Sequence, residues 1–369
     1  MVTTIKGGDS TIVNKQWAIR PPDQRFLSLE SLERFKAAVR QSAFESVIPL
    51  NKVQLKSSQA VNGDLYMETR NGPATLTHWA AGQLATRAGA PAAYLRKLPS
   101  ELALANLLWG MAHPPEAYDL ETKVLTVSDE GGFERSAAAF TSSTYGRIWD
   151  IDVVHAVQRV AESGTWKVPS SSYSSKDPLR ATTLYASDRD CFMFLVDEDH
   201  PIGLPGYDHP KYRGFVVWNS EVGNSKFGLM TMLYDYVCDN RLIWGMDQAT
   251  TLFIRHTSGG PDRFAYRAAP ALRAYADGSV KSLTDGIAAA RTFKLAETEK
   301  EAEKKLVELG LTQTMARLGL QMASNYTDGN PLSVWNLVEG VTEASHLYSN
   351  QDDRFAVESI AGRLMERVQ

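Results

Sequence analysis

Six short runs of β-branched and aromatic residues follow one another between residues 180 and 257, and turn-forming residues separate them. The runs read RATTLYAS, CFMFLVD, RGFVVWNS, KFGLMTMLYDYV, RLIWG and TLFIRHT. Consecutive strands joined by short loops favour antiparallel pairing. Residues 229–237 also fit helical spacing, but their turn boundaries and their Thr, Tyr and Val content favour a strand. We therefore predict an α+β fold with an antiparallel meander sheet over about residues 180–257, flanked by N-terminal and C-terminal helices.

The chain before this sheet has mainly helical patterns. Residues 27–44 repeat apolar positions at helical spacing, with Ser28 or Ser31 placed as N-cap. Residues 77–110 predict three short helices, because Gly and Pro residues interrupt the pattern. A hairpin is expected around the turn DEGG at 129–132, followed by a helix that ends at Gly164.

After about residue 282 the pattern becomes helical again. Acidic and basic residues four apart predict one long charged helix that ends at Gly310, and two further helices close the chain. We divide the chain into an N-terminal helical and hairpin region (1–165), a β-meander core (166–282) and a C-terminal helical region (283–369).

Composition indicates an ordinary globular protein with a sizeable core, since 43% of the 369 residues are hydrophobic. No apolar run is long enough to span a membrane, and the N-terminus lacks a secretory signal, so we expect a cytoplasmic protein without a membrane partner. The only two cysteines, Cys191 and Cys238, are expected to be reduced and buried. The net charge of −4 does not by itself indicate a polyanionic partner.

Residues 219–245, NSEVGNSKFGLMTMLYDYVCDNRLIWG, combine a Gly/Asn/Ser turn with a lone cysteine. The segment GNSKFG misses the spacing of a nucleophile elbow by one residue and lacks the Lys-Ser/Thr end of a phosphate-binding loop. No histidine lies close in sequence to activate Cys238, so packing explains it better than catalysis. We interpret the segment as a hairpin.

One acidic loop is a candidate metal site. Residues 197–209 read DEDHPIGLPGYDH and supply the candidate ligands Asp197, Asp199, His200 and Asp208, with Glu198 beside them. Carboxylates at the end of a strand suit magnesium or manganese, although this spacing matches no defined metal motif and suits a surface loop equally well.

A basic and aromatic segment, FIRHTSGGPDRFAYR, is the candidate polyanion site. Residues 254–295 contain seven Lys or Arg against three acids. Guanidinium groups bind phosphates and aromatic faces stack on unpaired bases, while a salt-bridged hairpin explains the segment equally well. The candidate nucleic-acid-binding residues are Lys226, Arg241, Arg255, His256, Arg263, Phe264 and Arg267, with Trp218, Trp244 or Phe264 as stacking residues.

Several separated blocks resemble the phage and plasmid proteins grouped as domain of unknown function 932. They include the segment 219–245, IRHT, SSTYGRIWDIDVVHAV and the C-terminal block from SVWNLVEG onwards, with an N-terminal match in residues 76–99. Gly340 departs from that pattern, where a larger or polar residue is expected. The resemblance implies a mobile-element gene expressed in a bacterial cytoplasm, and it supplies no catalytic residue.

Three functions are consistent with these patterns. The first is a non-enzymatic DNA-transaction protein of a phage or plasmid, active in recombination, that binds or anneals single-stranded DNA. The alternatives are a metal-dependent nuclease or phosphotransferase that uses the acidic loop, and a protein-binding host-takeover or anti-defence factor. We assign no catalytic residue and no cofactor, and the C-terminal helices are the expected surface for a homo-oligomer.

Overall fold

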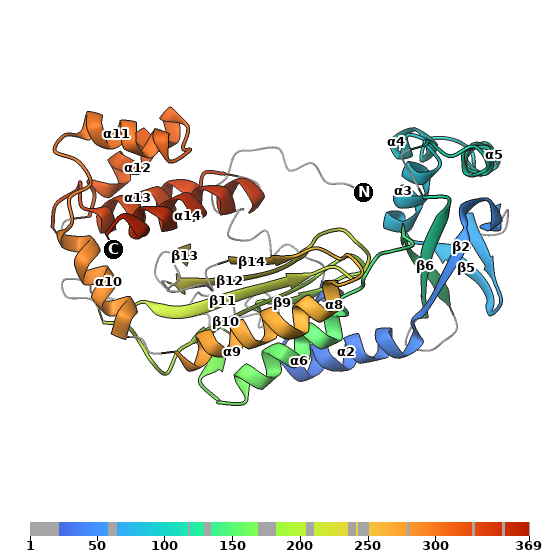
Figure 1. Ribbon diagram of the computed structural model, residues 1–369, viewed down its shortest axis with the longest axis horizontal. Coiled ribbons are helices and arrows are strands. Elements are labelled where there is room, and N and C mark those ends of the chain that lie inside the picture. The colour runs from blue at the N-terminus through green and yellow to red at the C-terminus, as the bar shows by residue number, and fades with distance from the viewer. Residues whose placement is uncertain are drawn as a thin grey trace.

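Two β-sheets and several groups of helices make up the described part of the computed structural model (Figure 1). The structure describes residues 22–57, 65–116, 119–128, 134–168, 182–203, 210–234, 241–242, 251–278, 281–326, 329–348 and 351–368. Among these residues no helix is long and apolar enough to cross a membrane. The combination of helices with largely antiparallel sheets confirms the predicted α+β class.

The central sheet has eight strands, and every strand pair in it is antiparallel. Side by side lie β1 (Arg25–Phe26), β9 (Leu184–Ala186), β10 (Cys191–Asp197), β11 (Tyr212–Asn219), β12 (Phe227–Tyr234) and β13 (Arg241–Leu242). In addition, β14 (Thr251–Ile254) pairs with β12, and β8 (Trp166–Lys167) pairs with β10. The predicted meander is confirmed, and strands from outside residues 180–257 extend it.

Both faces of the central sheet are buried, which explains the nearly continuous apolar runs of its strands. Alternate residues of β10, β11 and β12 pack on α2 (Leu29–Ser42), α6 (Asp150–Ala161) and α9 (Ala269–Asp277), which lie beneath the sheet in Figure 1. The intervening residues form a second, aromatic-rich cluster on the opposite face.

Helix α2 begins where the sequence predicts. Ser28 is its N-cap, and Ser28 and Ser31 form a capping box in which each side chain bonds the other's backbone N–H. Helix α6 is followed by Gly164 at a φ of 80°, as expected for a helix C-terminus.

A second, N-terminal sheet has six strands, of which the sequence predicted only the hairpin of two. In spatial order the strands are β2 (Phe44–Pro49), β6 (Glu121–Ser128), β7 (Arg135–Ser142), β5 (Gly72–Leu76), β4 (Leu65–Thr69) and β3 (Leu55–Ser57). The hairpin β6–β7 is confirmed. The others are short and polar on at least one side, so they gave no clear strand signal.

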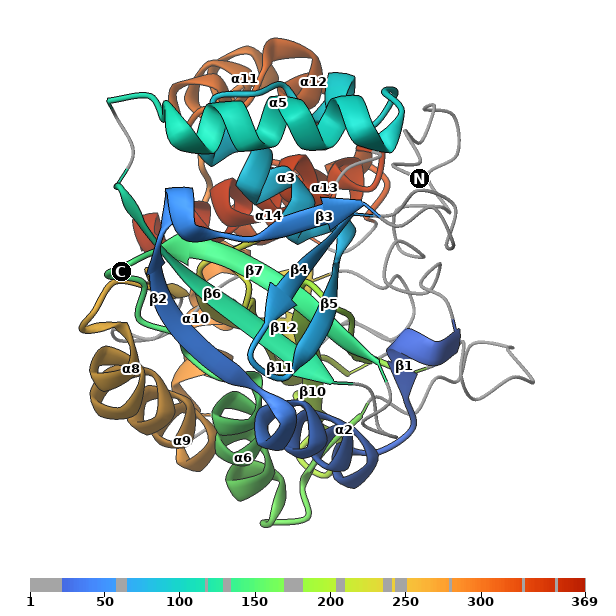
Figure 2. The ribbon, with the colours of Figure 1, turned by 90° about the vertical axis from the view of Figure 1, so that its right-hand side faces the viewer.

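Three predicted helices cover one face of this N-terminal sheet (Figure 2). They are α3 (His78–Arg87), α4 (Ala92–Leu95) and α5 (Ser100–Ala112). The remaining short elements are spread along the chain. The 3-10 helix η1 (Pro22–Gln24) precedes β1, and the 3-10 helix η2 (Leu50–Lys52) follows β2. The short helix α8 (Gly260–Arg263) and the π-helical turn η3 (Phe264–Ala268) follow β14.

The C-terminal helices form a separate core around Trp335. They are α10 (Lys281–Thr292), α11 (Glu299–Glu308), α12 (Gln313–Ala323), α13 (Val334–Ser345) and α14 (Gln351–Met365), with the 3-10 turn η4 (Glu366–Val368) at the end.

The prediction of one long helix from 282 to 310 is wrong, because the chain breaks between α10 and α11. The Leu295 N–H donates to the Leu332 carbonyl at 2.9 Å, and the Val334 N–H donates to the Phe293 carbonyl at 2.9 Å. Thr298 then caps α11. These pairings use backbone groups that a continuous helix would need.

A glycine is required at position 340 for a packing reason. At the crossing of α12 and α13, a Cβ on Gly340 would lie 2.3 Å from the Gly319 carbonyl oxygen and 2.5 Å from the Ala323 nitrogen. Both neighbours are backbone atoms, so the helices could admit a side chain only by moving apart.

We therefore expect Gly340→Ala to lower the free energy of unfolding by about 1–3 kcal/mol, the usual cost of overpacking a core. Gly82→Ala in α3 is the matched control, because its Cβ would meet only the flexible end of Arg96 at 3.2 Å. The control should stabilise the protein by up to about 1 kcal/mol through helix propensity. Urea unfolding measures both, and equal effects of the two variants would contradict the close crossing.

Candidate functional site

The turn between β11 and β12 is a hairpin, as predicted, but its first residues are deeply buried. Asn219, Ser220 and Glu221 are at most 5% exposed, and Gly223 has a φ of 81° that suits glycine. The Asn219 amide donates to the Asp150 carboxylate at 2.7 Å and to the Ile148 carbonyl at 2.8 Å. The residues whose composition suggested only a surface turn therefore also hold the hairpin to the interior of the protein.

A buried charge cluster forms around these residues of the hairpin, and we define it as Lys36, Asp150, Asn219 and Glu221. Lys36 on α2 and Asp150 in the first turn of α6 make an ion pair of 2.7 Å with both side chains at most 3% exposed. Glu221 accepts a hydrogen bond of 2.7 Å from the Asp150 backbone N–H. Two helices and one sheet hairpin are thus joined by charges.

Burial changes the protonation of these groups. Burial, together with the nearby Asp150 carboxylate, raises the pKa of Glu221 to about 7. Burial alone would lower the pKa of Lys36, but Asp150 and Glu221 outweigh it and raise that pKa, so Lys36 stays charged. Burial also raises the pKa of the Cys191 thiol, which packs in the core as predicted and does not form a thiolate nucleophile.

Stacked side chains connect the cluster to the N-terminal sheet. The Arg147 guanidinium bonds Glu45 of β2 at 2.9 Å and lies 5.2 Å from the Tyr145 ring. The Tyr145 ring stacks on His256 at 5.1 Å, and its hydroxyl donates to the Ser220 carbonyl at 3.1 Å. Burial lowers the pKa of His256 to about 4, and its Nδ1 accepts from the Ile148 N–H.

Helix α3 holds the same turn from the other side. Trp79 and Gln83 both donate side-chain hydrogen bonds to the Val222 carbonyl, at 3.0 and 2.7 Å. Gln83 also accepts from the Phe140 N–H of β7 at 2.9 Å. The two sheets are therefore connected through residues 219–222, and the turn is held in one conformation.

The outer side of the same hairpin carries exposed aromatic and basic groups. Gly228 lies between Trp218 of β11 and Phe253 of β14 in the register of the central sheet, so all three share one face. The Trp218 indole covers Gly228, because a Cβ at that position would lie 2.1 Å from the ring. Trp218 and Phe253 make an edge contact with centroids 5.8 Å apart, and the Lys226 ammonium lies 3.5 Å from the Phe253 centroid.

Continuing this register by one residue places Arg255 beside Lys226. Both side chains are exposed, and Phe253 is 39% exposed. We call Trp218, Lys226, Phe253 and Arg255 the basic aromatic platform.

The Gly-Gly segment after β14 starts a helix and does not turn into a second hairpin strand. Arg263 on α8 folds back to donate to the Thr257 hydroxyl, and Arg263 and Arg267 are both exposed. Tyr266 between them is 81% exposed. The segment that follows β14 therefore carries two further exposed positive side chains.

The predicted nucleic-acid-binding residues are thus divided. Lys226 and Arg255 lie together, whereas His256 and Phe264 face the core, with Phe264 packed on Phe227 at 5.0 Å. The Arg241 backbone pairs with Tyr234 at the far end of β12, about 23 Å along the strand, and its side chain lies outside the described residues, as do Trp244 and Cys238.

Of the predicted metal ligands, Asp197 and His200 lie together, whereas Asp199 has a different partner. Asp197 is buried and bonds Arg213 at 2.7 Å and His200 at 2.9 Å, while Asp199 bonds Lys167 on the surface at 2.9 Å. Asp208 lies outside the described residues. Among the residues that the structure describes, no group of three or more His, Cys, Asp or Glu side chains is arranged to hold a metal ion.

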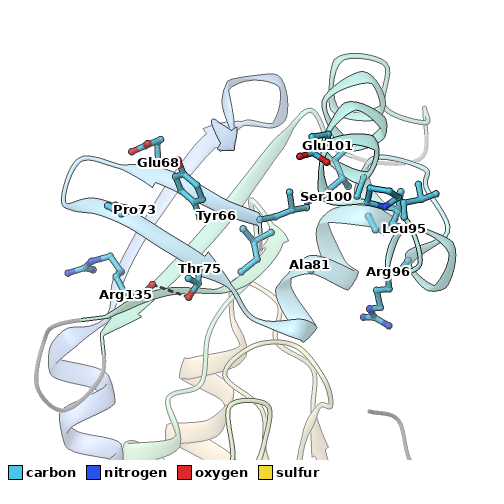
Figure 3. A pocket seen from close by; sticks show the side chains of 18 of the residues that line it. Tyr66, Glu68, Pro73, Thr75, Ala81, Leu95, Arg96, Ser100, Glu101 and Arg135 are labelled. Carbon is cyan, nitrogen blue, oxygen red and sulfur yellow. Dashed lines mark hydrogen bonds between the residues drawn. The ribbon is translucent and has the colours of Figure 1, made fainter. Parts of the chain in front are cut away.

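A hollow of about 1230 Å³ lies between the β4–β5 hairpin and helices α3 to α5 (Figure 3). Tyr66, Glu68 and Thr75 line it on the hairpin side, and Arg96 and Glu101 on the helix side. Its apolar floor and mixed charged rim resemble a binding groove. Glu68 is bonded to Lys56 at 2.9 Å.

Sequence reasoning found the platform's cations and Trp218 but missed Phe253 and the buried charge cluster. One signal for the cluster was present, because Lys36 follows Leu32 by four residues on the apolar stripe of α2. A charge on that stripe needs a buried partner, and the sequence does not say which one.

Glu221 gives a test of the cluster. A carboxyl whose pKa is raised on folding makes the folded protein less stable as the pH rises. The loss takes place between the ordinary pKa of 4.5 and the raised pKa of about 7. Glu221→Gln keeps the acceptor for the Asp150 N–H and cannot ionise, so the variant should gain stability relative to the parent by about 2 kcal/mol between about pH 5 and pH 8.

Urea unfolding at several pH values measures this gain. The pH-dependent contribution of His256 to stability cancels in the comparison, because both proteins contain that residue. The exposed Glu162→Gln at the end of α6 is the control and should show no such change. A constant stability difference between E221Q and the parent at all pH values would contradict the raised pKa.

No family model, no curated protein and no solved structure matches this chain significantly. The resemblance to the phage and plasmid family therefore stays a prediction, and the function must be argued from the geometry of the site.

Proposed function

We propose that the protein binds single-stranded nucleic acid on the basic aromatic platform of its central sheet. The contact between Lys226, Phe253 and Trp218 carries this proposal, because it combines two aromatic rings with a cation at a partly exposed end of the sheet. Such a combination suits a strand whose bases are unpaired, since ring faces stack on bases and cations hold phosphates. A duplex keeps its base faces covered and cannot use the rings in this way.

The energies favour exchange of the cation for a base. An exposed cation–π contact such as that of Lys226 with Phe253 contributes about 0.5–1 kcal/mol. Stacking of a base on an aromatic ring contributes about 1–3 kcal/mol. A base can therefore displace the ammonium from the ring, and Lys226 is then placed to bind the adjacent phosphate together with Arg255.

The cluster beneath the platform supports the same function. Residues 219–222 are held by hydrogen bonds from α3 and α6, so the platform needs little ordering when a ligand binds. Arg263 and Arg267 are also exposed in the segment that follows β14. The resemblance to phage and plasmid proteins supports a role in a DNA transaction of a mobile element in a bacterial cytoplasm.

The nuclease alternative has less support from the described geometry. Asp197 would have to leave a buried pair with Arg213 in order to bind a metal, and Asp199 bonds a lysine on the surface. The single-strand hypothesis uses exposed groups that need no such rearrangement.

Titration of a labelled single-stranded oligonucleotide at several salt concentrations tests the proposal. The affinity should fall steeply with salt, and the double variant Lys226→Gln, Arg255→Gln should reduce the slope of log K against log salt by about 1.4, since each phosphate contact to a single strand contributes about 0.7. Phe253→Leu, which keeps an apolar side chain, should weaken binding by about 1–3 kcal/mol with little change in slope.

Arg159→Gln is the matched control, because Arg159 is exposed on α6, which covers the opposite face of the sheet. The proposal is wrong if the parent does not bind at low salt, or if the control weakens binding as much as the platform variants. Cleavage of the oligonucleotide with magnesium or manganese would instead favour the nuclease alternative.

A further inference from the structure

Helix α5 exposes an apolar face although it belongs to the core of the N-terminal half. Its residues 102–112, LALANLLWGMA, contain no charged side chain. One side of the helix is buried through Ala103, Leu107 and Met111. On the other side, Leu102 is 54% exposed and Trp109 is 67% exposed. A helix that is apolar on all sides is expected to be covered on all sides.

Close packing fixes which side of α5 faces outwards. A Cβ on Gly110 would lie 2.2 Å from the Ala88 carbonyl oxygen, so α5 crosses the end of α3 in direct backbone contact. Rotation of the helix would bring a side chain into that contact. Figure 2 shows α5 lying crosswise at the end of the molecule that faces the viewer, with no other element drawn in front of it.

Trp109 is already ordered on this face. Its ring stacks on His113 with centroids 4.7 Å apart, and the His113 backbone N–H donates to the Trp109 carbonyl at 3.1 Å. An ordered tryptophan loses little side-chain freedom on binding, and tryptophan is among the residues that contribute most to interfaces.

We propose that α5 is a self-association surface, on which a second copy of this chain packs its own α5 in the antiparallel direction. In this pair a two-fold axis passes at the level of Leu107. Two residues, one from each helix, therefore lie opposite each other when their numbers add up to 214. It places Ala105 opposite Trp109 of the second copy, and Leu102 opposite Ala112. Leu102 and Trp109 therefore each meet an alanine, which allows two helices to approach to about 8–10 Å.

The charges on this face also select a second copy. A charged partner would lose hydration against a face that has no counter-charge, whereas the identical face buries no charge. In the antiparallel arrangement, the helix N-terminus with Glu101 lies at the same level as the C-terminus with His113 of the other copy. The opposed helix dipoles favour this direction over the parallel one.

The size of the face determines the strength of the contact. One helix pair buries less than the roughly 1,200–2,000 Å² of a stable dimer, so the dimer should be reversible and form at micromolar concentrations. The surface differs from the one expected from the sequence. Of the C-terminal helices that the sequence suggested for assembly, α13 is buried along nearly its whole length, whereas α11 has exposed positions.

Sedimentation velocity of the full chain between about 1 and 200 μM tests the proposal. The parent should move from monomer towards dimer over this range. Trp109→Glu places two like charges in an apolar contact and should leave a monomer at every concentration. Because Trp109 is 67% exposed in one copy, the variant should keep the parent's unfolding midpoint and its single-strand binding.

Leu347→Glu is the matched control, because Leu347 is 51% exposed in the C-terminal half after α13. This control should dimerise like the parent. A parent that stays monomeric at about 200 μM overturns the proposal, as does a dimer that Trp109→Glu leaves intact or that Leu347→Glu abolishes. Ala105→Leu gives a second reading, since a larger residue opposite Trp109 should weaken the dimer while the monomer stays folded.

Discussion

The buried ion pair between Lys36 and Asp150 is the contact on which the arrangement of this fold depends. It joins α2 to the start of α6, and through Asn219 and Glu221 it joins both helices to the central sheet. Loss of one partner from such a pair typically costs about 3–5 kcal/mol, because the other charge stays buried without compensation. A charge pair also accepts fewer alternative packings than an apolar contact, so it can define how α2 and α6 pack on the central sheet.

The hairpin above this pair has two sides with different roles. Its inner side, at residues 219–222, accepts bonds from α3 and α6, donates one from Asn219 to α6, and contributes to the core. Its outer side carries Lys226 and lies against Phe253 and Trp218. Arg255 and His256 directly follow β14, where successive side chains point to opposite faces of the sheet. Arg255 therefore lies on the platform, whereas the adjacent His256 lies in the core.

Much of the secondary structure could be predicted because its signals are local. Ser28 caps α2, glycine follows α6 and α11, and turn formers bound the strands of the meander. Apart from the β6–β7 hairpin, the N-terminal sheet could not be predicted, because β3, β4 and β5 are short and because β2 and β5 pair with strands far away in the chain. The break after α10 has the same origin, since its cause is the pairing of residues 293–295 with residues 332–334.

The sequence by itself determined the fold class, the meander and the residue types that suit phosphates and bases. Only the tertiary structure decided which of those residues lie together: it joined Lys226 and Arg255 with Phe253, directed His256 and Phe264 inwards, and separated Asp197 from Asp199. It also placed the uncharged face of α5 at the surface, through the contact of Gly110 with Ala88. Helix and strand periods follow from neighbours in sequence, whereas a site requires side chains from distant strands to meet, and that depends on register and packing.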